Sequence, residues 1–292
     1  MTNTGISVID ADIFRAAIAQ FQDLLAKNEQ LLNDLNVYPV PDSDTGTNSL
    51  QTLKAGMAQS GLKSTDLGEC ALSLATGAAK SAMGNSGVIL AQYFQGLAQG
   101  LTKVSTSFPK EWQQALIQAA SVARQSVLTP IEGTMLTIAD AAARVEAQPD
   151  FKKYYEEIQI AVRAAVIDTQ YLLPELKAAE VIDAGALVVS FLHDSFALTL
   201  GLTVSPLEVA APKLVDTSYS GPKFELMFAV MCAESIKTEI EALISALGES
   251  ISVSGAEPNF NFHIHTDKPD LVIESCEDKV EITNIRISEL GN

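Results

Sequence analysis

Two carboxylates stand two residues apart in a segment that begins at Asn36 and reads Asn-Val-Tyr-Pro-Val-Pro-Asp-Ser-Asp-Thr-Gly-Thr-Asn. Asp42 and Asp44 lie in a loop stiffened by prolines, and hard cations such as Mg²⁺ take oxygen ligands and usually bridge substrate phosphates. Thr45 to Asn48 then offer backbone amides and short hydroxyls at a predicted helix start, where phosphate oxygens could bind. An acidic turn that only caps the next helix is the ordinary alternative. The prolines and the Gly-Thr-Asn that follows favour the metal and phosphate site.

Three further loops each place a glycine near the start of a predicted helix. They are Met83–Leu90, with Gly-Asn-Ser-Gly; Glu132–Thr137, with Gly-Thr-Met; and Val181–Ala186, with Asp-Ala-Gly. A helix N-terminus exposes unpaired amide hydrogens and a positive dipole end, so it suits a phosphate. Helix capping is the more ordinary explanation of any one of these loops taken alone. Four such loops in one helical region favour a shared anion site.

Two histidines alternate along a predicted strand near the end of the chain. Phe260–Thr266 places apolar residues on one face and His263 and His265 on the other. Two imidazoles on one strand face are a plausible Zn²⁺ pair. Two histidines on the surface of a sheet are the equally weighted alternative.

The composition limits the kinds of partner. The chain has 292 residues, with 36 acidic and 19 basic residues and a net charge of −17. Such a surface excludes a general nucleic-acid binder and argues against docking on anionic membranes. Phosphate binding would need metal ions or backbone amides. The three cysteines form no CxxC pair, and we expect no signal peptide and a cytoplasmic location.

The positioning elements are predicted to be mostly helical, followed by a small mixed unit. Helical spacing covers Ile13–Leu35, Thr47–Ser60, Leu67–Ala82, Val88–Leu101, Lys110–Leu128, Thr134–Ala147, Phe151–Ala179 and Ala184–Leu202. His193 and Asp194 interrupt the most apolar stretch, Ala184–Val204, which favours a buried helix over a membrane span. Thr203–Pro222 is typical of a linker. Strands are then expected at Phe224–Met231, Ile251–Ser254, Phe260–Thr266 and Val280–Ile287, with helices at Ala233–Leu247 and Lys268–Ser275.

The helical region resembles the nucleotide-binding L subunit of dihydroxyacetone kinases. It is more closely similar to the N-terminal domain of the ATP-binding subunit of bacterial fatty acid kinases. The resemblance rests on the segments Asn36–Asn48, Gly84–Leu90, Glu132–Thr137 and Val181–Gly185, which occur in the family's order. The last unit resembles the middle domain of the fatty acid kinase subunit through Phe262–Pro269.

The resemblance implies a mainly α fold: an eight-helix antiparallel barrel over residues 1–203 that holds ATP and two Mg²⁺ ions at one end, then a small α+β domain over 213–292. Asp42 and Asp44 would be the catalytic metal ligands, with Asn36 as a third ligand where the dihydroxyacetone kinase form has an acidic residue. The implied nucleotide contacts are Thr45, Gly46, Thr47, Asn48, Asn85, Ser86, Gly87, Gly133, Thr134, Met135, Asp183 and Gly185.

The resemblance also supplies a third candidate zinc ligand. A cysteine early in the family's middle domain partners the histidine pair, and Glu225 aligns with that position here. Cys232 lies seven residues further on, and an odd offset along a strand places it on the opposite face. We therefore expect Glu225, rather than Cys232, beside His263 and His265.

Three departures from the family pattern bear on activity. Met83 stands where the fatty acid kinase form has an arginine that would stabilise charge on the transferring phosphoryl group. Ser43 replaces the usual glycine between the aspartates, a mild change if its φ is negative. Longer members continue into a further C-terminal domain, whereas this sequence ends about where the middle domain would end, so that part is expected on another chain or to be missing.

The implied function is that of an ATP-binding kinase subunit. It would transfer the γ-phosphate of Mg-ATP to a fatty acid carboxylate presented by a separate fatty-acid-binding protein, giving an acyl phosphate. Two alternatives stay open: a dihydroxyacetone-type (glycerone) kinase subunit, and a catalytically impaired nucleotide-binding regulatory protein. We expect a homodimer, no nucleic-acid partner and no stable membrane insertion.

Overall fold

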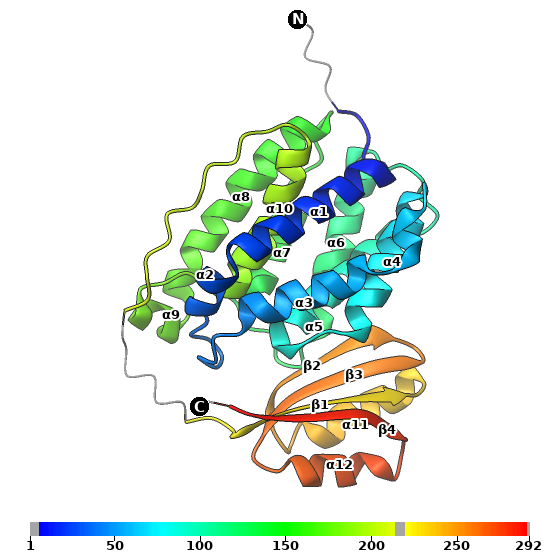
Figure 1. Cartoon of the computed structure of the whole chain (residues 1–292), viewed down its shortest axis with the longest axis vertical. Helices are drawn as coiled ribbons and strands as arrows, with labels where there is room; N and C mark the ends of the chain where they lie inside the picture. Colours follow the sequence, from blue (N-terminus) through cyan, green and yellow to red (C-terminus); the bar gives the residue numbers. More distant parts are fainter. Residues whose placement is uncertain (1–5, 214–219, 291–292) are drawn as a thin grey trace, which may run out of the picture.

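The computed structural model describes residues 6–213 and 220–290, which form a layer of helices above a small sheet (Figure 1). Eight helices of nine or more residues occur within 6–213. These are α1 (Ala11–Lys27), α3 (Thr45–Met57), α4 (Leu67–Lys80), α5 (Gly84–Gly100), α6 (Pro109–Gln125), α7 (Met135–Ala143), α8 (Phe151–Leu172) and α10 (Ala184–Thr199). Shorter turns are α2 (Glu29–Asp34), α9 (Pro174–Ala179) and the 3₁₀ helix η1 (Ser60–Lys63). The predicted mainly helical fold with a terminal α+β unit is confirmed.

Two of the predicted helices are each broken into two. The first ends at Asn28, whose side-chain amide donates to the Leu24 carbonyl at 2.8 Å and which separates α1 from α2. The second ends before Pro174, because proline lacks the amide hydrogen that a helix interior needs. In addition, α5 begins at Gly84 rather than Val88, so the Gly-Asn-Ser-Gly segment forms its first turn.

The helical layer packs around a cluster of fully buried aromatic rings. Trp112 lies 5.1 Å from Phe196 between ring centroids, and its indole nitrogen donates to the Tyr155 hydroxyl at 3.0 Å. Tyr155 in turn stacks on Phe196 at 5.7 Å. Large rings stabilise a core strongly, and the buried polar atoms of Trp112 and Tyr155 satisfy each other. This core holds the ends of the helices, and therefore their loops, in fixed positions.

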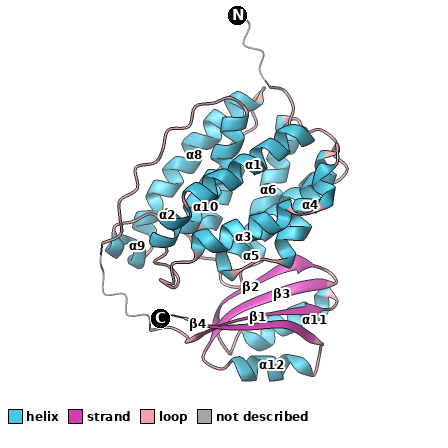
Figure 2. Cartoon of the chain, viewed as in Figure 1, coloured by secondary structure: helices cyan, strands magenta, loops and turns pink. Residues whose placement is uncertain are grey.

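The last unit is an antiparallel sheet with strand order β2-β3-β1-β4 (Figure 2). Its strands are β1 (Phe224–Met231), β2 (Glu249–Ala256), β3 (Asn259–Thr266) and β4 (Ile282–Glu289), and its helices are α11 (Glu234–Ile244) and α12 (Pro269–Glu277). Leu226, Phe228 and Phe262 belong to the core that these two helices cover. The alternate residues of the same strands therefore lie on the other face, which is turned toward the helical layer.

The sheet is joined to the helical layer by backbone hydrogen bonds. Val127, just after α6, forms an antiparallel bridge with Ser252 of β2. The Leu128 amide donates to the Ile251 carbonyl at 3.0 Å, and the Val253 amide donates to the Ser126 carbonyl at 2.9 Å. The segment after α6 thus extends the sheet beyond β2, which fixes the two units against each other.

The predicted linker runs back along the helical layer before the sheet begins (Figure 1). Residues 203–213 contain no helix or strand, and Leu207 and Val209 pack against the helical core. Residues 214–219 of this linker lie outside the described residues, as do residues 1–5 and 291–292 of the two predicted domains. No helix in the described part of the chain is long and apolar enough to cross a membrane.

Candidate nucleotide and metal site

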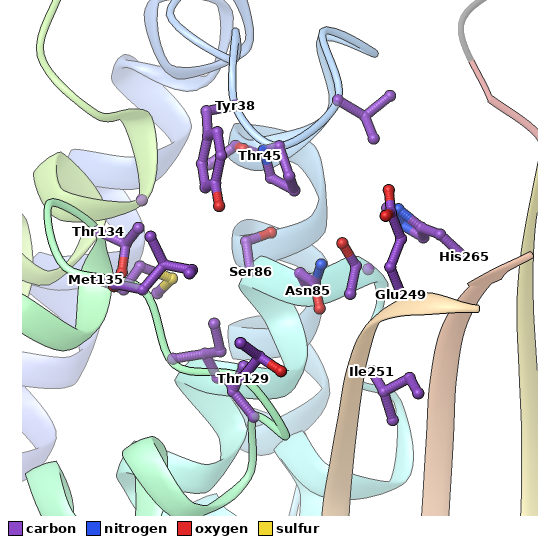
Figure 3. Close-up of a pocket in the computed structure, with 18 of the residues that line it drawn as sticks. Tyr38, Thr45, Asn85, Ser86, Thr129, Thr134, Met135, Glu249, Ile251 and His265 are labelled. Atoms are coloured by element: carbon purple, nitrogen blue, oxygen red, sulfur yellow. Dashed lines mark hydrogen bonds between the residues drawn. The ribbon is translucent and has the colours of Figure 1, made fainter. Parts of the chain in front are cut away.

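A cavity of about 620 Å³ lies where the lower ends of the helices meet the sheet (Figure 3). All four loops predicted from the sequence contribute to its lining, as do β1, β2 and β3. The predicted residues that line it are Asn36, Asp42, Asp44, Thr45, Asn85, Ser86, Thr134, Met135, Asp183, Gly185, Glu225 and His265. Segments more than a hundred residues apart in the chain therefore form one concave site.

The side chain of Asp44 is free of the capping role that was the ordinary alternative. Asp44 occupies the N-cap position of α3 but makes no side-chain capping bond. One of its oxygens accepts from the Asn48 side-chain amide at 2.7 Å. Burial, then the charge of neighbouring Asp44, raises the pKa of Asp42 to about 7. Two carboxylates that raise each other's pKa share a proton or bind a cation, and carboxylate oxygens are the ligands that Mg²⁺ prefers.

Asn36 holds the loop in shape through all of its polar atoms. Its side-chain oxygen accepts from the Thr45 amide at 2.9 Å and also from the Thr45 hydroxyl. Its side-chain nitrogen donates to the Val40 carbonyl at 2.6 Å. The oxygen already has two donors, so a ligand role for Asn36 would require the Thr45 hydroxyl to turn away.

The backbone of Ser43 does not have the negative φ that would have made its replacement of glycine a mild change. Its φ is +57°, in the left-handed region that favours glycine. An L-residue in this region is strained by about 1–2 kcal/mol. The replacement of glycine by Ser43 is therefore not the mild change that a negative φ would have made it.

The first turn of α5 offers an unpaired donor to the cavity. The Ser86 hydroxyl is buried and has no hydrogen-bond partner among the described residues. Gly84 has a φ of +57°, and a Cβ there would overlap the Asn48 side-chain amide, so any other residue at the start of α5 would be strained and would displace Asn48. Asn85 accepts a hydrogen bond from Ser252 at 2.9 Å, so it also ties the cavity wall to β2. Met83 is the N-cap residue of α5 and does not line the cavity.

Thr134 and Asp183 both cap helices and line the cavity. The Thr134 hydroxyl accepts from the Leu136 amide at 3.4 Å, and an Asp183 oxygen accepts from the Ala186 amide at 2.7 Å. Asp183 is 5% exposed, and burial raises its pKa to about 7. Helix capping therefore explains one hydrogen bond of each side chain. Both side chains also line the cavity, where they can contact a ligand.

The two histidines and Glu225 form a compact cluster at the edge of the same cavity. Their candidate ligand atoms all lie within 4.8 Å of one another. His263 places one ring nitrogen 3.0 Å from the Ser250 carbonyl and the other 3.0 Å from a Glu225 oxygen. Both of these partners are acceptors, so the second nitrogen needs either a proton or a metal ion toward Glu225.

The third member of this cluster, His265, presents an unpaired nitrogen. Its Nδ1 is buried without a hydrogen-bond partner in the described chain. Burial, then the charge of His263, lowers the pKa of His265 to about 3. His265 is therefore neutral, which is the form that binds metals. The donor set of Glu225, His263 and His265 fits a divalent transition metal.

Several predicted residues lie behind the cavity wall rather than on it. They are Gly46, Thr47, Asn48, Gly87, Gly133 and His263. Thr47 donates to Glu29 at 2.9 Å and accepts from Asn33 at 3.0 Å, which fastens α3 to α2. Asn48 supports Asp44, and His263 supports Glu225.

Other lining residues were not predicted from the sequence. Tyr38, Glu175 and Glu249 line the cavity, together with the segment Val127–Thr129 and Ile251. Burial, then the charges of Glu175, Asp183 and Glu249, raise the pKa of Tyr38. No local pattern marks Glu249, Ile251 or Val127–Thr129, because β2 and the end of α6 meet only through tertiary pairing. Tyr38 lay within the quoted segment and could have been included.

Two features define the class of this protein. Its helix-start loops surround a pair of aspartates, and a sheet closes the site from the other side. The chain belongs to the DAK2 domain family, because the model of the DAK2 domain matches residues 39–197, more than half of its length. Residues 221–292 match the model of the FakA-like middle domain of fatty acid kinase. The family resemblance stated from the motifs is confirmed by both matches.

Individual relatives are distant and longer than this chain. An uncharacterised protein of Staphylococcus saprophyticus is 28% identical over 98% of this chain and 56% of its own length. Protein YloV of Bacillus subtilis is 27% identical over the same shares. The chain thus spans a little over half the length of these relatives. The crystal structure of the dihydroxyacetone kinase from C. freundii in complex with AMP-PNP and Mg²⁺ matches 68% of this chain and 36% of that chain, at 19% identity and a TM-score of 0.48.

Proposed function

We propose that this chain is the nucleotide-binding unit of a kinase that phosphorylates a fatty acid carboxylate presented by a separate fatty-acid-binding protein. The product would be an acyl phosphate. The observation that carries the proposal is that four helix-start loops and the aspartate pair line one cavity. The match to the FakA-like middle domain of fatty acid kinase favours this acceptor over dihydroxyacetone.

The residues present fit ATP with Mg²⁺. Asp42 and Asp44 would hold the metal, which neutralises phosphate charge when bound. The unpaired Ser86 hydroxyl and the first amides of α5 would bind phosphate oxygens. Thr134, Met135 and Asp183 would frame the rest of the nucleotide. Phosphoryl transfer depends mostly on positioning and charge neutralisation, so the chain needs no nucleophile of its own.

Calorimetric titration with ATP, with and without Mg²⁺, tests the nucleotide site. We expect metal-dependent binding by the wild type and its loss in the Asp42→Ala, Asp44→Ala double variant. The matched control is Asp23→Ala, Asp168→Ala, which removes the same charge from exposed positions on α1 and α8. If wild-type protein binds no ATP under either condition, the kinase proposal fails for this chain.

Transfer itself is tested with fatty-acid-loaded carrier proteins and radiolabelled ATP. We expect label on the acyl group only when carrier, fatty acid and this chain are all present. Dihydroxyacetone in place of the loaded carrier tests the glycerone kinase alternative. Label that appears with dihydroxyacetone and not with any loaded carrier would overturn the choice of acceptor.

We also propose that the cluster of Glu225, His263 and His265 binds Zn²⁺. The unpaired His265 nitrogen and the paired acceptors around His263 support a cation there. Metal analysis after exposure to equimolar Zn²⁺ should find about one ion per chain in the wild type and none in a His263→Ala, His265→Ala variant. Equal zinc in both proteins would exclude this ligand set.

A further inference from the structure

The lining of the cavity is strongly acidic, which opposes the binding of a negatively charged phosphate. Six carboxylates line it, and the described lining contains no lysine or arginine. The carboxylates are Asp42, Asp44, Glu175, Asp183, Glu225 and Glu249. Metal ions at the aspartate loop offset part of this charge, but a nucleotide triphosphate adds more. A side-chain cation that reached the phosphates from beyond the cavity wall would offset part of the remaining charge.

The face of the sheet that is turned toward the helical layer carries one arginine. Met227 pairs with His263 of β3 on one side and with Arg286 of β4 on the other, so all three side chains share a face. Glu225 pairs with Ser288 on the same face, which makes Glu225 and Arg286 diagonal neighbours. Diagonal neighbours lie about 7–8 Å apart, within reach of a long side chain.

Glu225 lies between Arg286 and the aspartate loop. A Glu225 oxygen lies 3.8 Å from the position of a Cβ on Gly84, at the start of α5. Asn48 touches the same position and donates to Asp44. Arg286 therefore stands across Glu225 from the first turn of α5 and the paired aspartates.

Arg286 is also uncommitted, unlike the other arginines. Arg15, Arg124, Arg144 and Arg163 each form an ion pair. The Arg286 side chain is exposed and forms no hydrogen bond or ion pair with the side chains of the described residues. Against the effect of burial, the hydrogen bond with His263 lowers the pKa of Glu225, and the positive charge of Arg286 lowers it further. β4, red in Figure 1, is the edge strand next to β1.

We propose that Arg286 binds the terminal phosphate of a nucleotide whose metal lies at Asp42 and Asp44. The proposal rests on the nucleotide-binding function proposed above. An arginine suits this position because its planar guanidinium can bind two phosphate oxygens at once.

The test compares AMP-PNP and ADP as calorimetric probes on the full chain with saturating Mg²⁺. We expect Arg286→Gln to weaken AMP-PNP binding roughly tenfold or more, since a charge-assisted hydrogen bond is lost, while ADP binding changes less than about twofold. Arg286→Lys should recover part of the difference. Arg144→Gln is the control, because it removes the same charge from a side chain that is 81% exposed at the end of α7.

The outcomes separate this proposal from the function on which it rests. Selective loss of AMP-PNP affinity supports it. Unchanged affinities, or equal weakening of AMP-PNP and ADP, overturn it while leaving the nucleotide site in place. Absence of binding by the wild-type protein overturns the proposed function and this inference together. Matching urea unfolding curves establish that Arg286→Gln folds normally.

Discussion

Asp183→Asn is expected to stabilise this protein at neutral and alkaline pH. The Asp183 side chain is 5% exposed and accepts from the Ala186 amide at the start of α10. Asparagine has nearly the same shape and caps helices about as well as aspartate. The substitution therefore removes the cost of burying a charge while keeping an acceptor in place.

The magnitude follows from the pKa of the carboxyl. Burial raises the pKa of Asp183 from 3.8 to about 7, and at about 1.4 kcal/mol per unit this corresponds to about 4 kcal/mol. Because the folded-state pKa is the higher one, the folded protein binds the proton more tightly. The stability from Asp183 is then fully present below pH 3.8 and lost as the pH rises through about 7. We expect Asp183→Asn to be more stable than wild type by up to about 4 kcal/mol at pH 8.

Urea unfolding at several values between pH 5 and pH 8 measures this difference. The excess stability of Asp183→Asn should shrink steadily as the pH falls toward 5. Asp10→Asn is the matched control, since Asp10 caps α1 by accepting from the Ile13 amide at 2.9 Å. We expect that control to change stability by less than about 0.5 kcal/mol. An Asp183→Asn protein that is less stable than wild type at pH 8 would show that the N-terminus of α10 outweighs desolvation.

Three smaller predictions are also tested by unfolding, the first two in urea and the third by heating. Ser43→Gly should stabilise the chain by about 0.5 kcal/mol, because relief of the positive φ exceeds the entropy cost of glycine; a loss would contradict this, and Ser43→Ala should give no gain. Ser252→Ala should cost about 1 kcal/mol through the lost bond to Asn85, and an unchanged midpoint would count against that bond. Saturating Mg²⁺ should raise the melting temperature of wild type but not of Asp42→Asn, and an equal rise in both would place the ion elsewhere.

Much of the fold follows from local pattern. The apolar spacing predicted the long helices and the alternation of Phe260–Thr266 to within a few residues, because each buries one face against a core. The exceptions are the two predicted helices that the structure divides. Each is divided by a single residue, which the apolar spacing does not reveal. Asn28 ends α1 through its own side chain, and Pro174 ends α8 by lacking an amide hydrogen.

The residue types alone predicted which loops line the cavity, because Asp42, Asp44 and Ser86 lie in motifs typical of metal and phosphate binding. Which of the neighbouring residues face the cavity depends instead on how the elements pack. Thr47 bonds to Glu29 of α2 instead of facing the cavity. Asn48 donates to Asp44 and packs against the start of α5.

The sheet's part in the site is likewise a tertiary result. The pairing of Val127 with Ser252 brings β2 against the end of α6, and this brings Glu249 and Ile251 into the cavity wall. The strand register sets Arg286 beside Glu225. Contacts between segments more than a hundred residues apart leave no periodic trace in either segment, because each forms only when both units have folded.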